Sequence, residues 1–330
     1  MFLLCALLLS QTGDAPSLGQ GRALTKQLYE LKISKLWAVA GQGLKQQLGS
    51  EANLKEFATK LRRDFGTEMR VISEGLSYDE ETELTIYRRV AAFSNWARGV
   101  DLELTLDEHG TCMGVSARRA SKEAPTTYGT HKARTRLRLP FEGQWYVLWG
   151  GRSWQNNRHS AVSDQRYALD LLQLTRSGKT FEGDGRRNEQ YAAWGKPVLA
   201  AGEGTVVVAE DVVLDNEPGT SRGVGILYGN HVVIDHGNGE FSLVAHLMHG
   251  SLHVKVGDWV ESGEVVARTG NSGMSSEPHI HYQLMDKADW HLANGFPAEF
   301  QNFQLNDRVI QRGEPRRADF ISPVPLEARR

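Results

Sequence analysis

Two histidines separated by a single residue, in Pro278-His279-Ile280-His281-Tyr282, are the sharpest chemical feature of this chain. The run predicts a β-strand, and residues i and i+2 of a strand point to the same face. His279 and His281 should therefore project side by side. Imidazole nitrogens can bind a transition metal or carry a proton near neutral pH. Two such histidines without further functional residues nearby are more often structural than functional. A catalytic or metal-binding role therefore requires additional side chains from other parts of the chain.

Candidate partners come from three other segments of the chain. His246 ends the apolar run 241–245, which predicts a position at strand depth. Asp170 lies inside the largely apolar run 167–172, where a carboxylate has a desolvation cost unless a cation or hydrogen-bond donors meet it. His159 lies upstream in a polar loop. We therefore expect the three segments that contain His246, Asp170 and His159 to converge on the histidine strand.

A set of His, Asp and His ligands with an open fourth position is typical of a catalytic zinc site. Such a site polarises a carbonyl and lowers the pKa of bound water towards neutrality. The two remaining histidines could act as general base and as stabiliser of the transition state. The composition agrees, because 11 histidines stand against only 2 cysteines and thiolates could not build the site.

The order of these residues resembles that of the lysostaphin-like, LytM-type zinc metallopeptidases, which cut peptidoglycan peptides. The resemblance covers about residues 150–300 and includes Ala-His-Leu around His246 and Pro-His-x-His ending at His281. It also rests on connecting runs rich in turn residues, at 197–204, 229–237, 256–260 and 269–273.

The resemblance implies a function and a role for each site residue. His159, Asp170 and His281 would bind one Zn²⁺ per chain, and His246 and His279 would be the catalytic pair. The substrate would be a peptide bond in the stems or crossbridges of peptidoglycan, hydrolysed during remodelling or lysis of the cell wall. The implied enzyme is a zinc metalloendopeptidase.

Three positions depart from the family pattern. The family usually places its first histidine four residues before the aspartate, whereas His159 precedes Asp170 by eleven positions and needs a longer loop. Val244 stands where family members often have tyrosine, and Glu277 stands where glycine is common. None of the three departures removes a catalytic group.

Two other classes of function remain open. One is a catalytically inactive LytM-like protein of the cell envelope that binds or activates a partner. The other is a biotinyl or lipoyl carrier-like module, because residues 256–266 contain a barrel-forming phrase shared with such carriers. A carrier function would not explain His246, His279 and His281. Residues 256–266 are therefore better interpreted as a sequence that both classes share because they form similar strands and turns.

The elements that would present these residues are predicted to be short strands. Between about 139 and 300, β-rich runs are separated by glycine turns, and the turn at 236–239 (His-Gly-Asn-Gly) indicates a hairpin. The predicted fold is a mainly β C-terminal domain, an antiparallel sheet of barrel-sandwich-like peptidase type, over residues 150–300. Residues 126–149 would supply a linker and entry strands, and residues 301–330 a polar surface tail.

Residues 20–125 predict a small α+β accessory domain. A helix should begin after Ser50, a plausible N-cap, and end at Gly66, and alternating apolar residues follow. Helices followed by an antiparallel meander resemble the nuclear-transport-factor-like domains in pattern.

The ends and the charge of the chain limit its location and partners. Residues 1–15 read as a signal peptide, since the apolar run 2–9 is too short to span a bilayer, and we expect export to the periplasm, the cell envelope or the medium. No transmembrane segment is predicted. A formal charge of −2, from 38 basic and 40 acidic residues, excludes a broadly basic nucleic-acid binder.

Overall fold

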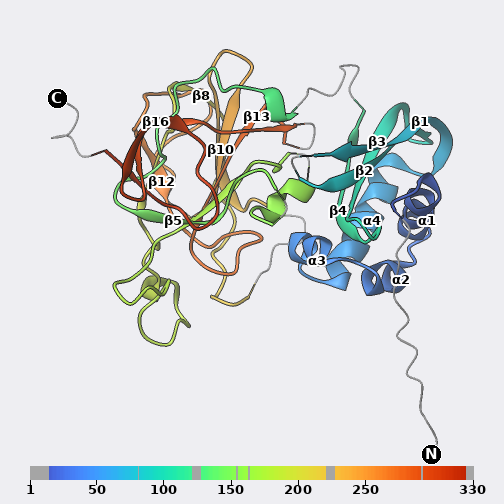
Figure 1. Ribbon diagram of the computed structural model, residues 1–330, viewed down its shortest axis with the longest axis horizontal. Helices are drawn as coiled ribbons and strands as arrows, with labels where there is room; N and C mark the ends of the chain where they lie inside the picture. The colour runs from blue at the N-terminus through green and yellow to red at the C-terminus, as the bar shows by residue number, and fades with distance from the viewer. Residues whose placement is uncertain are drawn as a thin grey trace, which may run out of the picture.

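A computed structural model describes residues 15–80, 82–120, 128–153, 155–162, 164–220, 227–290 and 293–324. These residues form two adjoining units, each with its own sheet and its own apolar core (Figure 1). The predicted signal peptide lies outside the described residues apart from Ala15. Within the described ranges, every helix is too short or too polar to cross a membrane.

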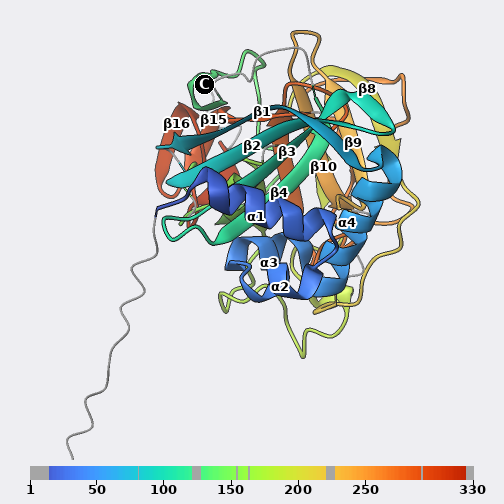
Figure 2. The same ribbon diagram turned by 90° about the vertical axis from the view of Figure 1, so that its right-hand side faces the viewer.

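The N-terminal unit is a layer of helices on an antiparallel meander. Figure 2 shows α1 lying across one face of the sheet formed by β1 to β4. Ser50 caps α4, since its side chain accepts from the backbone N–H of Asn53, and Gly66 ends that helix at φ 83°. The α+β prediction is confirmed. The elements are α1 (Leu18–Tyr29), α2 (Ile33–Ala38), α3 (Gln42–Leu48), α4 (Glu51–Phe65), β1 (Glu68–Asp79), β2 (Leu84–Phe93), β3 (Trp96–Leu106) and β4 (Cys112–Arg119).

The C-terminal unit is mainly antiparallel β-structure, as predicted. Its large sheet runs in the order β11-β8-β9-β10-β13-β6-β5-β17-β15-β16, with β14 paired to β13, and β7 and β12 form a separate pair. The strands before residue 300 are β5 (Trp145–Trp149), β6 (Leu169–Leu172), β7 (Pro197–Leu199), β8 (Gly204–Glu210), β9 (Asn230–Asp235), β10 (Phe241–Leu247), β11 (Trp259–Val260), β12 (Val265–Arg268), β13 (Ile280–Met285) and β14 (Gly295–Phe296). Three 3₁₀ turns, η1 (Tyr128–Thr130), η2 (Arg158–Ala161) and η3 (Asn188–Gln190), connect them.

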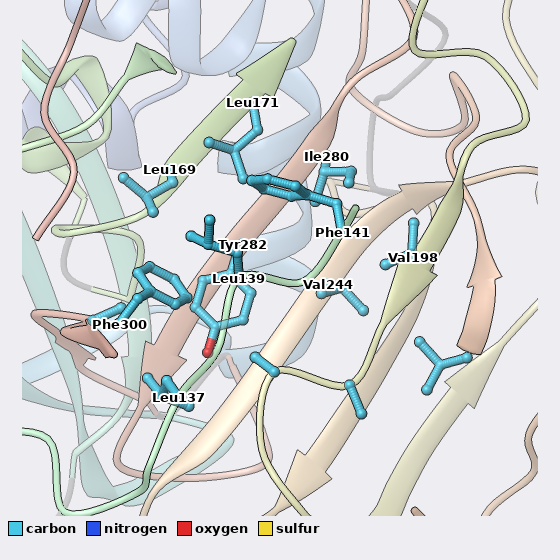
Figure 3. Close-up of a cluster of buried hydrophobic side chains, with 14 of the residues drawn as sticks. Leu137, Leu139, Phe141, Leu169, Leu171, Val198, Val244, Ile280, Tyr282 and Phe300 are labelled. Carbon is cyan, nitrogen blue, oxygen red and sulfur yellow. The ribbon is translucent and has the colours of Figure 1, made fainter. Parts of the chain in front are cut away.

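The histidine strand β13 lies near the middle of this sheet, between β10 and β6. Alternate residues of these strands point into a large apolar core, where Leu169 and Leu171 of β6 meet Ile280 and Tyr282 of β13 (Figure 3). The residues between them must face the other side of the sheet. The apolar core therefore fixes the face on which Asp170 and His281 lie.

The predicted hairpin at 236–239 joins β9 to β10. Gly237 and Gly239 have φ values of 75° and 81°, a region that glycine adopts without strain. This hairpin sets the register between β9 and β10, and β10 in turn pairs with β13.

The polar tail predicted over 301–330 is wrong for most of its length. Residues in this part of the chain form β15 (Phe300–Leu305), β16 (Arg308–Gly313) and β17 (Phe320–Pro323), and β17 pairs with β5 of the large sheet. Phe303 and Ile321 are fully buried. The strands near the sheet edge bury only isolated apolar residues among polar ones, which gives little periodic signal in the sequence.

Candidate active site

Three strands bring Asp170, His281 and His246 together. The antiparallel register places His281 opposite Asp170 on β6 and opposite Ala245 on β10. Residues directly opposite each other in a sheet have their side chains on the same face. Nδ1 of His281 lies 2.9 Å from Oδ1 of Asp170, and both residues are buried.

His159 joins this pair from outside the sheet. It lies in η2, eleven positions before Asp170 in the chain, and its Nε2 is 3.4 Å from Oδ2 of Asp170. The ring centroids of His159 and His281 are 4.9 Å apart. One ligand atom from each of the three residues lies within 4.8 Å of the other two. The longer loop thus returns His159 to the aspartate, as the proposed ligand set requires.

The orientation of His159 is set by Asn157, which is fully buried. Oδ1 of Asn157 lies 3.0 Å from Nδ1 of His159 and also accepts from the backbone N–H of His159 at 3.1 Å. The amide nitrogen of Asn157 donates to the carbonyl oxygens of Gly151 and Ala168. Because the amide oxygen faces Nδ1, that nitrogen is the protonated one, and Nε2 presents a lone pair to Asp170.

His281 has a comparable partner on its outer side. Its Nε2 is 2.9 Å from Oε1 of Gln283, the residue two positions along on the same face of β13. Oη of Tyr228 lies 3.0 Å from the same Oε1 and 2.7 Å from Oδ2 of Asp164. In the tautomer that carries its proton on Nε2, His281 donates to Gln283 and has the Nδ1 lone pair left for a ligand beside Asp170.

His246 is presented by a distorted strand. Its φ is 59°, a left-handed conformation that is unusual for a residue other than glycine, and the pairing of β10 with β9 shifts register between Val244 and Leu247. Such a bulge turns a side chain away from the regular alternation. Nδ1 of His246 lies 2.8 Å from the carbonyl oxygen of Ser272, so Nε2 faces the other histidines.

His279 lies beside His246, with the ring centroids 4.6 Å apart. Its Nδ1 is 2.8 Å from the carbonyl oxygen of Glu277 and 3.1 Å from Oγ of Ser275. Its Nε2 is 3.7 Å from Oδ1 of Asp170. The structure therefore brings all five residues predicted for the site to one place, although their roles stay a proposal.

Burial sets the protonation of this cluster. Desolvation lowers the pKa of His159 to about 4 and the pKa of His246 well below its usual value. Burial alone would raise the pKa of Asp170, but the imidazoles of His159, His279 and His281 outweigh it and hold that pKa well below its usual value. At neutral pH His159 is thus a neutral imidazole beside the carboxylate of Asp170, the forms in which these two groups bind a metal, and His246 is neutral as well.

Two of the three distances between donor atoms also fit a zinc site. Two ligand atoms of a tetrahedral zinc site lie roughly 3.3 Å apart, because each is about 2.0 Å from the metal. The distances of 3.4 Å from His159 to Asp170 and 2.9 Å from Asp170 to His281 bracket this value. Both imidazoles have the outward nitrogen hydrogen-bonded, as metal-binding histidines usually do.

The site opens into a cleft of about 290 Å³ that both units line. Gln46 and Gln47 come from α3 of the N-terminal unit, and Trp149 and Arg158 come from the C-terminal unit. The sequence did not predict these cleft residues, because no local pattern links α3 to the histidine strand. Asn157 and Gln283 each lie two positions from a proposed ligand. That spacing was a sequence signal from which they could have been predicted as hydrogen-bond partners of His159 and His281.

The resemblance inferred from the sequence is confirmed by comparison with known proteins. Residues 189–292 match the model of a family described as Peptidase family M23. This range includes His246, His279 and His281, whereas His159 and Asp170 precede it. The match supports a peptidase and covers about a third of the chain.

Curated relatives match over a similar length. The chain is 35% identical over 91 residues to the peptidoglycan DD-endopeptidase ShyA of Vibrio cholerae, covering 28% of this chain and 18% of the relative. It is 36% identical over 94 residues to the DD-carboxypeptidase/endopeptidase Mpg of Neisseria meningitidis, with coverage of 28% and 18%. The matched segment thus spans less than a fifth of either relative.

Solved structures give weaker likenesses. The catalytic domain of lysostaphin from Staphylococcus simulans is 24% identical, with a TM-score of 0.26, over 39% of this chain and 74% of that one. The M23 metalloprotease pseudoalterin is 18% identical, with a TM-score of 0.32, over 53% of this chain and 83% of that one.

Proposed function

We propose that this chain is a zinc-dependent endopeptidase that hydrolyses peptide bonds in the stems or crossbridges of peptidoglycan. The observation that carries the proposal is the convergence of His159, Asp170 and His281 with two further histidines in the lining of one cleft. The matched M23 segment and relatives named as peptidoglycan endopeptidases support the class of substrate. Such a substrate also implies that the protein works outside the cytoplasm, as the predicted signal peptide does.

The three proposed ligands would hold zinc through Nε2 of His159, a carboxylate oxygen of Asp170 and Nδ1 of His281. A bound zinc ion would polarise the scissile carbonyl and lower the pKa of an attacking water. The protein supplies the rest of the chemistry through its orientation of the ligands. Asn157 and Gln283 hold the outward nitrogens of the two imidazoles, so that neither ring has to rotate when the metal binds.

His246 is suited to act as the general base. Its Nδ1–H donates to the carbonyl oxygen of Ser272, and burial keeps the ring neutral at neutral pH. The lone pair on Nε2 can therefore accept a proton from the attacking water. The protonated ring can then return that proton to the leaving amine.

His279 is suited to stabilise the negative charge that develops on the carbonyl oxygen. Its Nδ1–H donates to the carbonyl oxygen of Glu277, and the carboxylate of Asp170 lies 3.7 Å from its Nε2. In its doubly protonated form, His279 would present Nε2–H to the oxyanion. Such a donor contributes most in a site where water is excluded.

The test combines metal content with turnover on purified cell walls. The wild type should bind one zinc ion per chain, and chelation should abolish hydrolysis. His281→Ala should lose zinc, whereas His246→Ala should keep zinc and lose turnover by about 10²- to 10⁴-fold. An absence of stoichiometric metal, together with hydrolysis that survives chelation, would overturn the proposal.

An inactive LytM-like binding or activator protein is the outcome if zinc binds but no wall or muropeptide substrate is turned over. The tautomers argue for the enzyme, because His246 has its Nδ1 hydrogen-bonded and a free lone pair towards the cleft. A protein that only bound a partner would gain nothing from a left-handed residue at that position.

A further inference from the structure

The segment between the proposed ligands His159 and Asp170 is bound by the N-terminal unit. Arg166 lies in this segment and its side chain is fully buried. Its Nη1 is 2.8 Å from Oδ2 of Asp79 at the end of β1, and its Nη2 is 3.3 Å from Oε1 of Glu103 on β3. Because a buried guanidinium is stable only when it is paired, these two carboxylates help to fix the position of the segment.

The segment has little regular structure of its own. Its backbone hydrogen bonds are short-range ones, such as Ser160 to Asn157, Gln165 to Val162 and Ala168 to Gln165. Asn157 joins the two ends through its bond to the carbonyl oxygen of Ala168. The position of the intervening residues relative to β6 therefore depends on contacts from outside the segment.

The N-terminal unit also contacts the turn that contains His159. Helix α3 and strand β4 both contact η2. Gln47 joins α3 to β4, because its Nε2 donates to the carbonyl oxygen of Val115 at 2.8 Å and its Oε1 accepts from the N–H of Val115 at 3.1 Å. The surface that supports η2 is thus itself held together by hydrogen bonds.

A second arginine crosses the boundary in the opposite direction. Nη1 of Arg118 on β4 donates to the carbonyl oxygen of Ala293 and to Oδ1 of Asn294, both at 2.9 Å. Its Nε lies 3.3 Å from Oδ2 of Asp101 in its own sheet. Each unit therefore inserts one buried or nearly buried arginine into the other, which fixes their relative orientation.

We propose that the N-terminal domain is part of the metal centre, with Arg166 as a positioning residue that holds the 159–170 segment so that His159 meets Asp170. The inference rests on the proposed function, because it assumes that His159 is a metal ligand. The described residues of the N-terminal domain supply none of the three proposed ligands, but they stabilise the eleven-residue segment through contacts that its own short-range hydrogen bonds do not provide. Loss of this support should weaken zinc binding by about 10- to 100-fold, as loss of other groups that orient ligands does.

The experiment measures zinc affinity of the full chain by competition with a chromophoric chelator. Asp79→Asn combined with Glu103→Gln, and separately Arg166→Met, should weaken zinc binding, and Arg166→Lys should restore part of it. Glu68→Gln is the matched control, since it removes a half-buried pair with Arg89 within the N-terminal sheet. It should leave zinc affinity unchanged.

A double-mutant cycle separates positioning from a general loss of structure. In a His159→Ala background, Arg166→Met should cause no further loss of zinc affinity, because the group it positions is already absent. An equal loss in both backgrounds, or wild-type affinity in the folded Asp79→Asn and Glu103→Gln double variant, would overturn the inference. If Arg166→Met does not fold, the same cycle is run with Arg166→Lys. An equal loss of zinc affinity in both backgrounds, or wild-type affinity in the folded Asp79→Asn and Glu103→Gln double variant, would again overturn the inference. A wild type that binds no zinc would instead contradict the proposed function.

Discussion

The four imidazole rings of the site are held in the same way: one nitrogen of each ring has a hydrogen-bond partner outside the cluster, and the other faces the cluster around Asp170. His159 uses an amide oxygen, His281 uses the amide of Gln283, and His246 and His279 use backbone carbonyls. Fixed tautomers remove the need to reorganise when a metal or substrate binds. The side chains and carbonyls around the rings therefore matter as much as the rings themselves.

Gln283→Met tests whether the hydrogen bond to Gln283 orients the imidazole of His281 for metal binding. Methionine fills a similar volume, but its thioether sulfur is a much weaker acceptor than an amide oxygen for Nε2–H of the buried His281. We expect zinc affinity to fall by about 10- to 100-fold with the fold retained. Chelator competition measures the affinity and circular dichroism checks the fold. Unchanged affinity would show that Gln283 does not orient the ligand.

The raised pKa of Asp164 should make the free energy of unfolding depend measurably on pH. Burial raises its pKa to about 6, whereas the unfolded chain releases this proton near pH 4. Above pH 6 the folded state therefore contains a buried charge that destabilises it, and this cost disappears as the pH falls from about 6 to about 4.

Asp164→Asn should accordingly be more stable than the wild type by about 3 kcal/mol at pH 7.5, and the difference should shrink towards pH 4. Asparagine keeps an oxygen that can accept from Oη of Tyr228. Urea unfolding of both proteins at several pH values gives the comparison. A difference that does not vary with pH, or a less stable variant at pH 7.5, would contradict this interpretation.

At the scale of elements, the site depends on one irregularity in an otherwise regular sheet. The bulge in β10 puts His246 in a left-handed conformation, which costs about 1 kcal/mol or more for a residue with a Cβ. The strain persists because β9 and β13 hold β10 on both sides.

A pair of substitutions at His246 measures this strain. Both His246→Gly and His246→Ala remove the imidazole, but only glycine relieves the positive φ. The glycine variant should therefore have a free energy of unfolding about 1 kcal/mol higher than the alanine variant, with both inactive. Equal stability of the two variants, or greater stability of alanine, would show that the conformation is not strained.

The sequence predicted the elements whose signals are local. Ser50 and Gly66 bound α4 as expected, and the turn at 236–239 forms its hairpin. His279 and His281 both lie near Oδ1 of Asp170, as the alternation of the strand predicted. The bulge at His246 could not be predicted, since it depends on pairing between strands. The strands β15 to β17 were missed because Phe303 and Ile321 are isolated apolar residues in polar runs.

At the scale of the whole molecule, two apolar cores meet across a boundary that contains charged groups. The proposed ligand segment lies at this boundary, so contacts far apart in the sequence decide its position. The sequence predicted the two units but not that one would support the other, because no periodicity links Asp79 or Glu103 to Arg166. Domain boundaries read from the sequence remain predictions.

If the two units stabilise each other across this boundary, they should unfold together in one cooperative transition. Arg166→Met leaves Asp79 and Glu103 without the guanidinium and should weaken the boundary by about 3–5 kcal/mol. We expect one calorimetric transition for the wild type and two for the variant, since the cores would then unfold separately. Glu68→Gln again serves as the control. A single transition in both Arg166→Met and wild type would contradict the coupling.

The most direct test of the central claim is mass analysis of products from defined muropeptides incubated with the zinc-loaded full chain. We predict that a peptide bond in the stem or crossbridge gains one water, giving two fragments, and that zinc-loaded His246→Ala leaves the same muropeptide intact. Intact muropeptides with the wild type, or identical fragments from wild type and His246→Ala, would contradict the account.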